Sequence, residues 1–202
     1  MIKHKLYVIL IALAGFLTVS AQQDDKAREI LDKVASTYKE SKGMKITFKG
    51  TQKGTLWVKN NSFVLDCGGV KSWFDGETQW SYVKENDEVN ISSPTPEELE
   101  TVNPYALVTM YRKGYNFRYD GYKLRMGKPG QEISLFAKGQ GEVQRIVLNI
   151  DENSIPAYIG IDMKNGHYEE LVSETFEKVT LSDEFFRFDS KQYPTAEVID
   201  LR

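Results

Sequence analysis

The fold is decided by the stretch Gly54-Thr55-Leu56-Trp57-Val58-Lys59-Asn60-Asn61-Ser62-Phe63-Val64-Leu65. Apolar and polar residues alternate before Asn60-Asn61, and a second apolar run follows it, which is typical of half-buried strands. A two-residue loop that contains Asn favours a tight hairpin turn. We therefore expect two antiparallel strands here, at residues 53–59 and 63–65.

The same pattern continues on both sides of this hairpin. An alternating run precedes it, and short runs follow it that are separated by turn residues such as Asp75-Gly76 and Glu85-Asn86-Asp87. These runs lie at residues 44–48, 72–74, 79–83 and 88–91. Because successive strands are joined by short turns, the sequence predicts an antiparallel meander.

A second series of strands is expected in the later part of the chain. The candidates are residues 115–119, 122–126 after a turn at Asp120-Gly121, 132–136, 143–150, 155–163 and 167–172. An aromatic tail follows, with Phe185, Phe186 and Phe188. Ten or more strands do not stay flat, so the sheet should curl toward a barrel or a partial barrel.

Two helical regions accompany the strands. Asp24-Asp25 precedes an amphipathic segment that runs to about Glu40, and its apolar residues recur every three or four positions. In the middle of the chain, Thr95-Pro96-Glu97-Glu98 is typical of a helix start with a capping box. A second short helix is expected at residues 105–111. It is apolar nearly all round, so it must be covered by, or must itself cover, other apolar residues.

The N-terminus has the features of an export signal. Lys3 and Lys5 precede the apolar run Leu6–Val19, and Val19-Ser20-Ala21 fits a signal-peptidase site. The run of about 14 residues is shorter than the roughly 20 that span a bilayer. We therefore predict a cleaved signal peptide at residues 1–21, a single domain at residues 22–202, and a soluble protein in the periplasm.

The net charge argues against some binding partners, and the cysteine count excludes an internal disulfide. The formal charge is −3 and becomes −5 when Lys3 and Lys5 are removed, which argues against nucleic acid as a partner. It also argues against binding of anionic membranes by charge alone. Cys67 is the single cysteine, so an internal disulfide cannot form and stability must come from core packing.

Catalytic and cofactor signatures are scarce. His167 is the one histidine left after cleavage, and neither a metal partner nor a nucleophile motif lies near it in sequence. Gly139-Gln140-Gly141 does not open a helix, so a phosphate site is not expected. We predict no cofactor, no metal and no enzymatic activity.

Aromatic residues are crowded into the first two-thirds of the domain, and periodicity alone leaves two interpretations. A curled sheet needs large side chains for its core, which would explain Trp57, Trp73 and Trp80. Alternatively, the strands and the apolar helix enclose a cavity that binds acyl chains, in which each buried methylene contributes roughly 0.8 kcal/mol.

Specific motifs resemble the family of the periplasmic outer-membrane lipoprotein carrier protein, LolA. They are Gly54-Thr55-Leu56-Trp57-Val58-Lys59, then Phe63, and Phe74-Asp75-Gly76-Glu77-Thr78-Gln79-Trp80-Ser81-Tyr82. The order of signal, helix, meander, Asn103-Pro104 helix and further strands is also similar over nearly all of the mature chain. The resemblance implies an α+β, mainly β fold: an incomplete antiparallel β-barrel (a curled sheet) with an N-terminal helix and a helical lid over an apolar cavity.

The resemblance also implies a function and a site. Family members accept a lipoprotein from an inner-membrane lipoprotein-releasing transporter, shield its acyl chains and deliver it to the outer membrane, through an acceptor where one exists. We expect a monomer. Alternation places Leu56, Val58, Phe63 and Leu65 in the acyl-binding cavity, with Trp80, Tyr82, Val89 and Ile91 as further candidates. The lid would present Tyr105, Leu107, Val108, Met110 and Tyr111.

One position departs from the family pattern. Family members often have an Arg directly after the Trp-Val-Lys motif, where it helps to hold the lid shut, and this chain has Asn60. Asn offers an amide but no cation with five donors. The cavity is therefore carried over from the family, whereas the lid lock is not.

Two alternatives remain. The same scaffold could serve as an envelope sensing or interaction module, which would usually carry a further domain or a membrane link. An enzyme acting on lipid or glycan would need more than His167.

Overall fold

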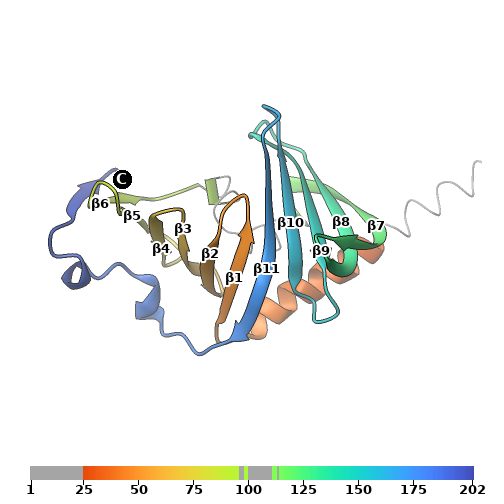
Figure 1. Cartoon of the computed structure of the whole chain (residues 1–202), viewed down its shortest axis with the longest axis horizontal. Helices are drawn as coiled ribbons and strands as arrows, with labels where there is room; N and C mark the ends of the chain where they lie inside the picture. The colour runs from red at the N-terminus through yellow and green to blue at the C-terminus, as the bar shows by residue number, and fades with distance from the viewer. Residues whose placement is uncertain (1–24, 96–97, 100–110, 113) are drawn as a thin grey trace, which may run out of the picture.

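The computed structural model describes residues 25–95, 98–99, 111–112 and 114–202. The predicted signal peptide lies outside these residues. Within them, the chain begins with a helix at residues 25–40 and then forms twelve strands that belong to one sheet. Figure 1 shows the helix lying along one side of the sheet. A long C-terminal segment, residues 179–202, follows the other side.

The strands fall into two meanders and a final short strand. The first meander contains β1 (Met44–Gly50), β2 (Gly54–Lys59), β3 (Ser62–Cys67), β4 (Val70–Phe74), β5 (Gln79–Val83) and β6 (Glu88–Ser92). The second contains β7 (Tyr115–Arg125), β8 (Lys128–Ala137), β9 (Val143–Ile150), β10 (Pro156–Met163) and β11 (Tyr168–Lys178). The chain ends with 3-10 helices η1 (Asp183–Phe186) and η2 (Ser190–Gln192) and with β12 (Glu197–Asp200).

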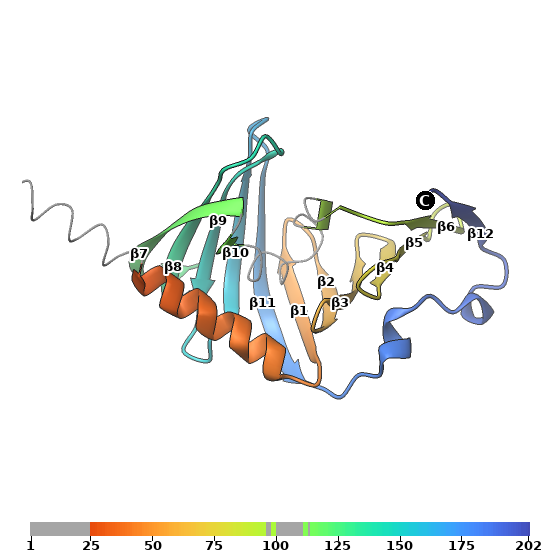
Figure 2. The ribbon, with the colours of Figure 1, turned by 180° about the vertical axis from the view of Figure 1, so that it is seen from behind.

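The sheet order is β12-β6-β5-β4-β3-β2-β1-β11-β10-β9-β8-β7. Antiparallel pairing of β1 with β11 joins the two meanders in the middle of the sheet. Because β12 and β7 are two separate ends of this order, the described sheet is curled but not closed (Figure 2). The predicted mainly β fold, an incomplete barrel with an N-terminal helix, is confirmed.

The opening hairpin forms as predicted. Lys59 pairs with Ser62, so Asn60 and Asn61 are the two loop residues. Asn60 has φ 52°, a left-handed conformation that Asn tolerates better than most residues. At this position the chain therefore makes a tight turn.

Two predictions about strands are wrong. Residues 115–125 form one continuous strand, and Asp120-Gly121 is a bulge in its pairing with β8 rather than a turn. The reversal comes later, at Met126-Gly127. The sheet is also not wholly antiparallel, because β12 pairs with β6 in parallel.

The sheet separates two apolar layers. The helix contributes Ala27, Leu31, Val34 and Tyr38 to the main core, which also contains side chains from β1–β4 and β8–β10. We call the sheet face that the helix covers the inner face. The outer face of β2–β5 is covered by the C-terminal segment, where Phe186 is buried against Val64 and Trp73.

Candidate functional site

The candidate site is the apolar part of the inner face on β1–β3. Strand pairing sets Leu56 opposite Leu65 and Val58 opposite Phe63, and directly opposed residues share a face. Leu56, Val58 and Phe63 are buried in the main core, and Leu65 packs against it while partly exposed. The structure therefore brings together these four residues, which the sequence analysis selected for the cavity.

The further candidates, Trp80, Tyr82, Val89 and Ile91, whose face the sequence left open, lie on the other face of the sheet. Trp80 pairs with Trp73 and with Ile91, and Tyr82 pairs with Val89. Trp73, Trp80 and Tyr82 belong to the outer apolar layer under the C-terminal segment. Alternation leaves the choice between the two faces open for an isolated strand, and the register with β4 decides it.

Leu99 and Tyr111, the described residues on either side of the predicted lid, reach the inner face. Leu99 packs against the main core, and Tyr111 is buried in it with a relative exposure of 1%. Of the predicted lid residues, Tyr105, Leu107, Val108 and Met110 lie outside the described residues. Leu99 and Tyr111, the described residues that precede and follow 100–110, thus contact the same core as Leu56, Val58 and Phe63.

The start of this segment has the predicted capping box. The backbone N–H of Glu98 donates to Thr95 Oγ1 at 3.3 Å, and the backbone N–H of Thr95 donates to Glu98 Oε2 at 2.7 Å. This reciprocal pair satisfies two N–H groups at a helix N-terminus. This capping box marks the point after β6 at which the chain begins the helical residues 98–99.

A polar contact ties the far end of the segment to the N-terminal helix. The carboxylate of Asp32 accepts hydrogen bonds from the Tyr111 hydroxyl and the Arg112 guanidinium. Arg112 Nε also donates to the Tyr111 hydroxyl at 3.1 Å, and the Tyr111 ring packs edge-on against Phe117 with centroids 5.4 Å apart. We call Asp32, Tyr111 and Arg112 the helix latch. The sequence did not reveal it, because its partners lie 79 and 80 positions apart.

The helix latch shifts the pKa of its members. Burial by itself would raise the pKa of Asp32, but the hydrogen bonds from Tyr111 and Arg112 and the nearby positive charges outweigh burial and lower it. Burial and the bond to Asp32 raise the pKa of the Tyr111 hydroxyl, which Arg112 opposes. The latch is therefore an ionised pair with a neutral phenol at neutral pH.

Acid should open the helix latch. An aspartate with a folded pKa below its unfolded value of about 3.9 stabilises the fold above that value, and the stabilisation is lost as the pH falls through the folded pKa. Asp32→Asn should thus lower the melting temperature at neutral pH. The difference from wild type should shrink as the pH is lowered from about 4. Thermal unfolding across this pH range tests it, and a difference that does not change with pH would contradict the assignment.

The inner face becomes polar toward the β6 side. Leu56 and Leu65 form an apolar row across β2 and β3. Ser72 is opposite Leu65 on one side and Ser81 on the other, so this serine pair continues the row. The two hydroxyl oxygens are 3.0 Å apart, and Gln79 Nε2 donates to Ser81 Oγ at 3.0 Å. A hollow of about 660 Å³ adjoins Gln79, Ser92 and Glu98. A ligand on this face would therefore meet apolar groups at β1–β3 and hydroxyl and amide groups beyond β4.

The residues considered for catalysis do not assemble a site. His167 lies beside Glu169 on an exposed strand end, with Nε2 3.4 Å from the carboxylate. Cys67 Sγ donates to Gln52 Oε1 at 2.9 Å, and burial raises the pKa of its thiol, which disfavours the reactive thiolate. Among the described residues, no group of three or more His, Cys, Asp or Glu side chains could hold a metal ion.

Asn60 stands where family members often have the Arg that holds the lid shut, and the structure shows what Asn60 and its neighbour Lys59 do instead. Asn60 makes the hairpin turn, whereas the preceding Lys59 points toward the C-terminal segment. Lys59 Nζ donates to the Leu181 carbonyl at 2.8 Å and lies 2.9 Å from Asp183 Oδ1. The Lys59 cation thus fastens the C-terminal segment to the sheet.

A membrane-spanning helix has to be both long and apolar. In the part of the chain that the structure describes, no helix meets both requirements.

Comparisons with known proteins identify relatives of the chain. A family model described as "Outer membrane lipoprotein carrier protein LolA" matches residues 17–167. No curated protein matches the sequence significantly. An uncharacterized conserved protein from Thermus thermophilus has a similar crystal structure, with a TM-score of 0.62 and 15% identity over 87% of this chain and 99% of that chain.

Two further solved structures are more distant. A DUF1329 family protein from Desulfovibrio piger has a TM-score of 0.51 and 10% identity, covering 82% of this chain and 97% of that chain. A putative outer membrane lipoprotein-sorting protein domain from Vibrio parahaemolyticus has a TM-score of 0.45 and 10% identity, covering 79% and 97%. At these identities the Thermus and Desulfovibrio similarities concern the fold alone.

Proposed function

Because the chain belongs to the family of the outer membrane lipoprotein carrier protein LolA, we propose that it is a periplasmic carrier of lipoproteins. It would hold their acyl chains on the apolar inner face and move them from the inner to the outer membrane. The proposal includes removal of residues 1–21 and a monomeric domain at residues 22–202. The transfer partners would be an inner-membrane lipoprotein-releasing transporter and, where one exists, an outer-membrane acceptor.

One observation carries this proposal. Leu99 and Tyr111 pack on the same apolar core that contains Leu56, Val58 and Phe63. In the proposal, residues 105–111 form the lid that the sequence predicts, which would cover this apolar surface and admit a ligand. Such an arrangement suits reversible shielding of acyl chains, which are bound by burial of methylene groups.

The polar continuation of the inner face supports a lipidated ligand rather than a free hydrocarbon. A lipoprotein has acyl chains joined to an ester- and amide-containing head. Leu65 and Ser72 are neighbours across the β3–β4 pair, so an acyl chain on β1–β3 would place its head near the Ser72–Ser81 hydroxyls and Gln79. These groups can donate and accept hydrogen bonds.

Substitution at Leu65 tests the proposal. Leu65→Asn puts an amide into the apolar row at a partly exposed position and should weaken binding of a fluorescent fatty acid by about tenfold, since a loss of about 1.4 kcal/mol corresponds to that factor. Trp80→Ala is the control, because Trp80 lies on the outer face and its loss should leave the binding constant unchanged. Fluorescence titration of both variants gives the answer.

The same variants can be tested for lipoprotein carriage. Wild-type protein recovered from the envelope should carry lipoprotein that mass spectrometry detects, and Leu65→Asn should carry less. Two results would count against the proposal: no acyl-chain uptake by the wild type, or equal loss of uptake in the Leu65 and Trp80 variants.

A further inference from the structure

The far end of the β7–β8 hairpin exposes large apolar side chains. Tyr122, Leu124 and Met126 have relative exposures of 66%, 70% and 64%. We call residues 122–129 the hairpin tip. Single exposed apolar residues are common on protein surfaces, but three in alternate positions of one short hairpin are not explained by packing.

Strand register orients the two faces of the hairpin tip. Tyr122 is opposite Gln131 and Leu124 is opposite Pro129, whereas Lys123 is opposite Gly130. The Gly130 side lies against the sheet, because a Cβ added there would be 2.0 Å from Asn149 Oδ1. The face with Tyr122, Leu124 and Pro129 therefore points away from the sheet, and in Figures 1 and 2 this end of β7 bends over the side opposite the helix.

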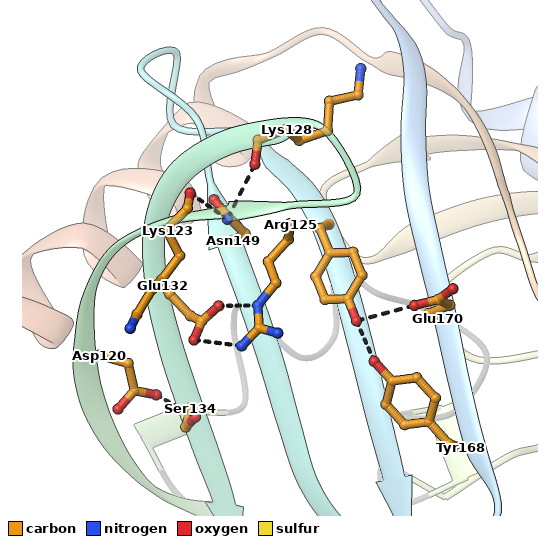
Figure 3. A network of polar contacts seen from close by, with 10 residues as sticks. Asp120, Lys123, Arg125, Lys128, Glu132, Ser134, Asn149, Tyr168 and Glu170 are labelled. Carbon is orange, nitrogen blue, oxygen red and sulfur yellow. Dashed lines mark hydrogen bonds and ion pairs between the residues drawn. The ribbon is translucent and has the colours of Figure 1, made fainter.

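Polar contacts hold the hairpin tip in place (Figure 3). Arg125 donates to the Glu132 carboxylate from Nε at 2.5 Å and from Nη2 at 3.0 Å, and Glu132 is buried. Asn149 Nδ2 donates to the backbone carbonyls of Lys123 and Lys128 at 3.2 and 3.4 Å. One buried amide thus joins the two strands of the tip to the sheet. The apolar residues are presented on a braced element rather than on a loose loop.

The turn itself carries an unusual residue. Met126 has φ 47°, in the left-handed region that favours Gly, Asn or Asp. A polar Asn-Gly turn would be conformationally easier and more soluble than Met126-Gly127. The sequence therefore accepts local strain where it places an apolar side chain at the outermost point of the hairpin, and such outliers are concentrated at functional sites.

The charges of the hairpin tip are cationic. Lys123 and Lys128 form no ion pair with the described residues, and Arg125 lies behind them with Glu132. Asp151 and Glu152, on a separate loop, and Glu174, which forms an ion pair with Lys49, line the same hollow of about 330 Å³ as Tyr122 and Lys128. Exposed apolar side chains with lysines next to them in the sequence, and a Tyr among them, are typical of segments that bind at a bilayer interface.

We propose that the hairpin tip docks on the surface of a bilayer with anionic headgroups and inserts Tyr122, Leu124 and Met126 among the lipids. A protein partner fits less well, because a stable protein interface needs roughly 800 Å² on each side and the tip presents only a few side chains. The acidic charge of the whole chain is no obstacle, since the contact combines apolar insertion with local lysines. Docking is independent of the proposed carrier function.

Flotation with vesicles of phosphatidylethanolamine and phosphatidylglycerol tests the proposal on the full chain. Leu124→Ser should lower the vesicle partition constant by about tenfold or more, since burial of one Leu side chain contributes roughly 1.5–3 kcal/mol. Met126→Asn should also reduce it while keeping the fold, because Asn tolerates the left-handed turn. Leu201→Ser is the matched control: Leu201 is 64% exposed at the other end of the sheet, so this variant should bind like wild type.

Charge gives a second arm of the same experiment. Joint replacement of Lys123 and Lys128 by Gln should weaken binding to the anionic vesicles and leave the weaker binding to phosphatidylcholine vesicles unchanged. The proposal is overturned if the wild type does not float, if Leu124→Ser with Met126→Asn floats like wild type, or if the tip instead drives self-association in sedimentation experiments. Fatty-acid binding should be the same in all tip variants, which separates docking from the carrier function.

Discussion

Phe186→Ala is expected to lower the free energy of unfolding by about 3–5 kcal/mol, the usual loss for truncating a buried Phe. Phe186 is 1% exposed and packs with Val64 and Trp73 on the outer face. Removing its ring would leave a hole in a small apolar layer that the C-terminal segment covers. Urea unfolding followed by circular dichroism measures the change.

The adjacent phenylalanine is the control. Phe185 is 39% exposed and makes edge-on ring contacts with Trp57 and Phe186 at 6.0 and 5.4 Å. Phe185→Ala should therefore lose only about 1 kcal/mol. Equal losses from the two substitutions would show that the C-terminal segment does not act as a core layer.

Gly130→Ala is the second large effect, with an expected loss of about 2–3 kcal/mol from overpacking. The new Cβ would lie 2.0 Å from Asn149 Oδ1 and 2.4 Å from the Ile150 carbonyl oxygen. Asn149 is fully buried, and the carbonyl belongs to the backbone, so neither atom can move away without shifting β8 from β9. The substitution should also release the hairpin tip, because Asn149 holds both of its strands.

A glycine on an open loop is the matched control for Gly130. Nothing lies within 4 Å of the position where a Cβ would be added at Gly141. Gly141→Ala should therefore be neutral or stabilise the protein by about 0.5 kcal/mol, through a smaller entropy of the unfolded chain. Chemical unfolding compares the two variants, and hydrogen exchange of residues 122–129 reports the release of the tip. Protected amides in Gly130→Ala would argue against the bracing role.

Local sequence patterns predicted most of the strands and the helix correctly. The Asn60-Asn61 turn and the Thr95–Glu98 capping box were readable because all of their partners lie within a few residues. Asp120-Gly121 misled the prediction, since the same dipeptide suits a turn or a bulge. Only pairing with β8 distinguishes the two, and this pairing is set by distant residues.

The candidate site was predictable in part for the same reason. Leu56, Val58, Phe63 and Leu65 flank one turn, so their common face follows from the hairpin. Trp80 and Tyr82 lie on a later strand, and the C-terminal segment that covers them is more than 90 residues further along the chain. The aromatic residues that are crowded in the sequence pack in two places, the main core and the layer under the C-terminal segment. Periodicity contains no information on the second layer.

The pairing of β1 with β11 has a consequence for the order in which the protein can fold. Thr47 and Thr175 are joined across this seam although 128 positions separate them. Contacts between such distant residues form slowly, because a long loop must close before they are gained. When the chain emerges N-terminus first, the edge of β1 stays unpaired until β11 follows. Chaperone protection of that edge during biogenesis would matter more for this protein than for one whose strands all pair with sequence neighbours.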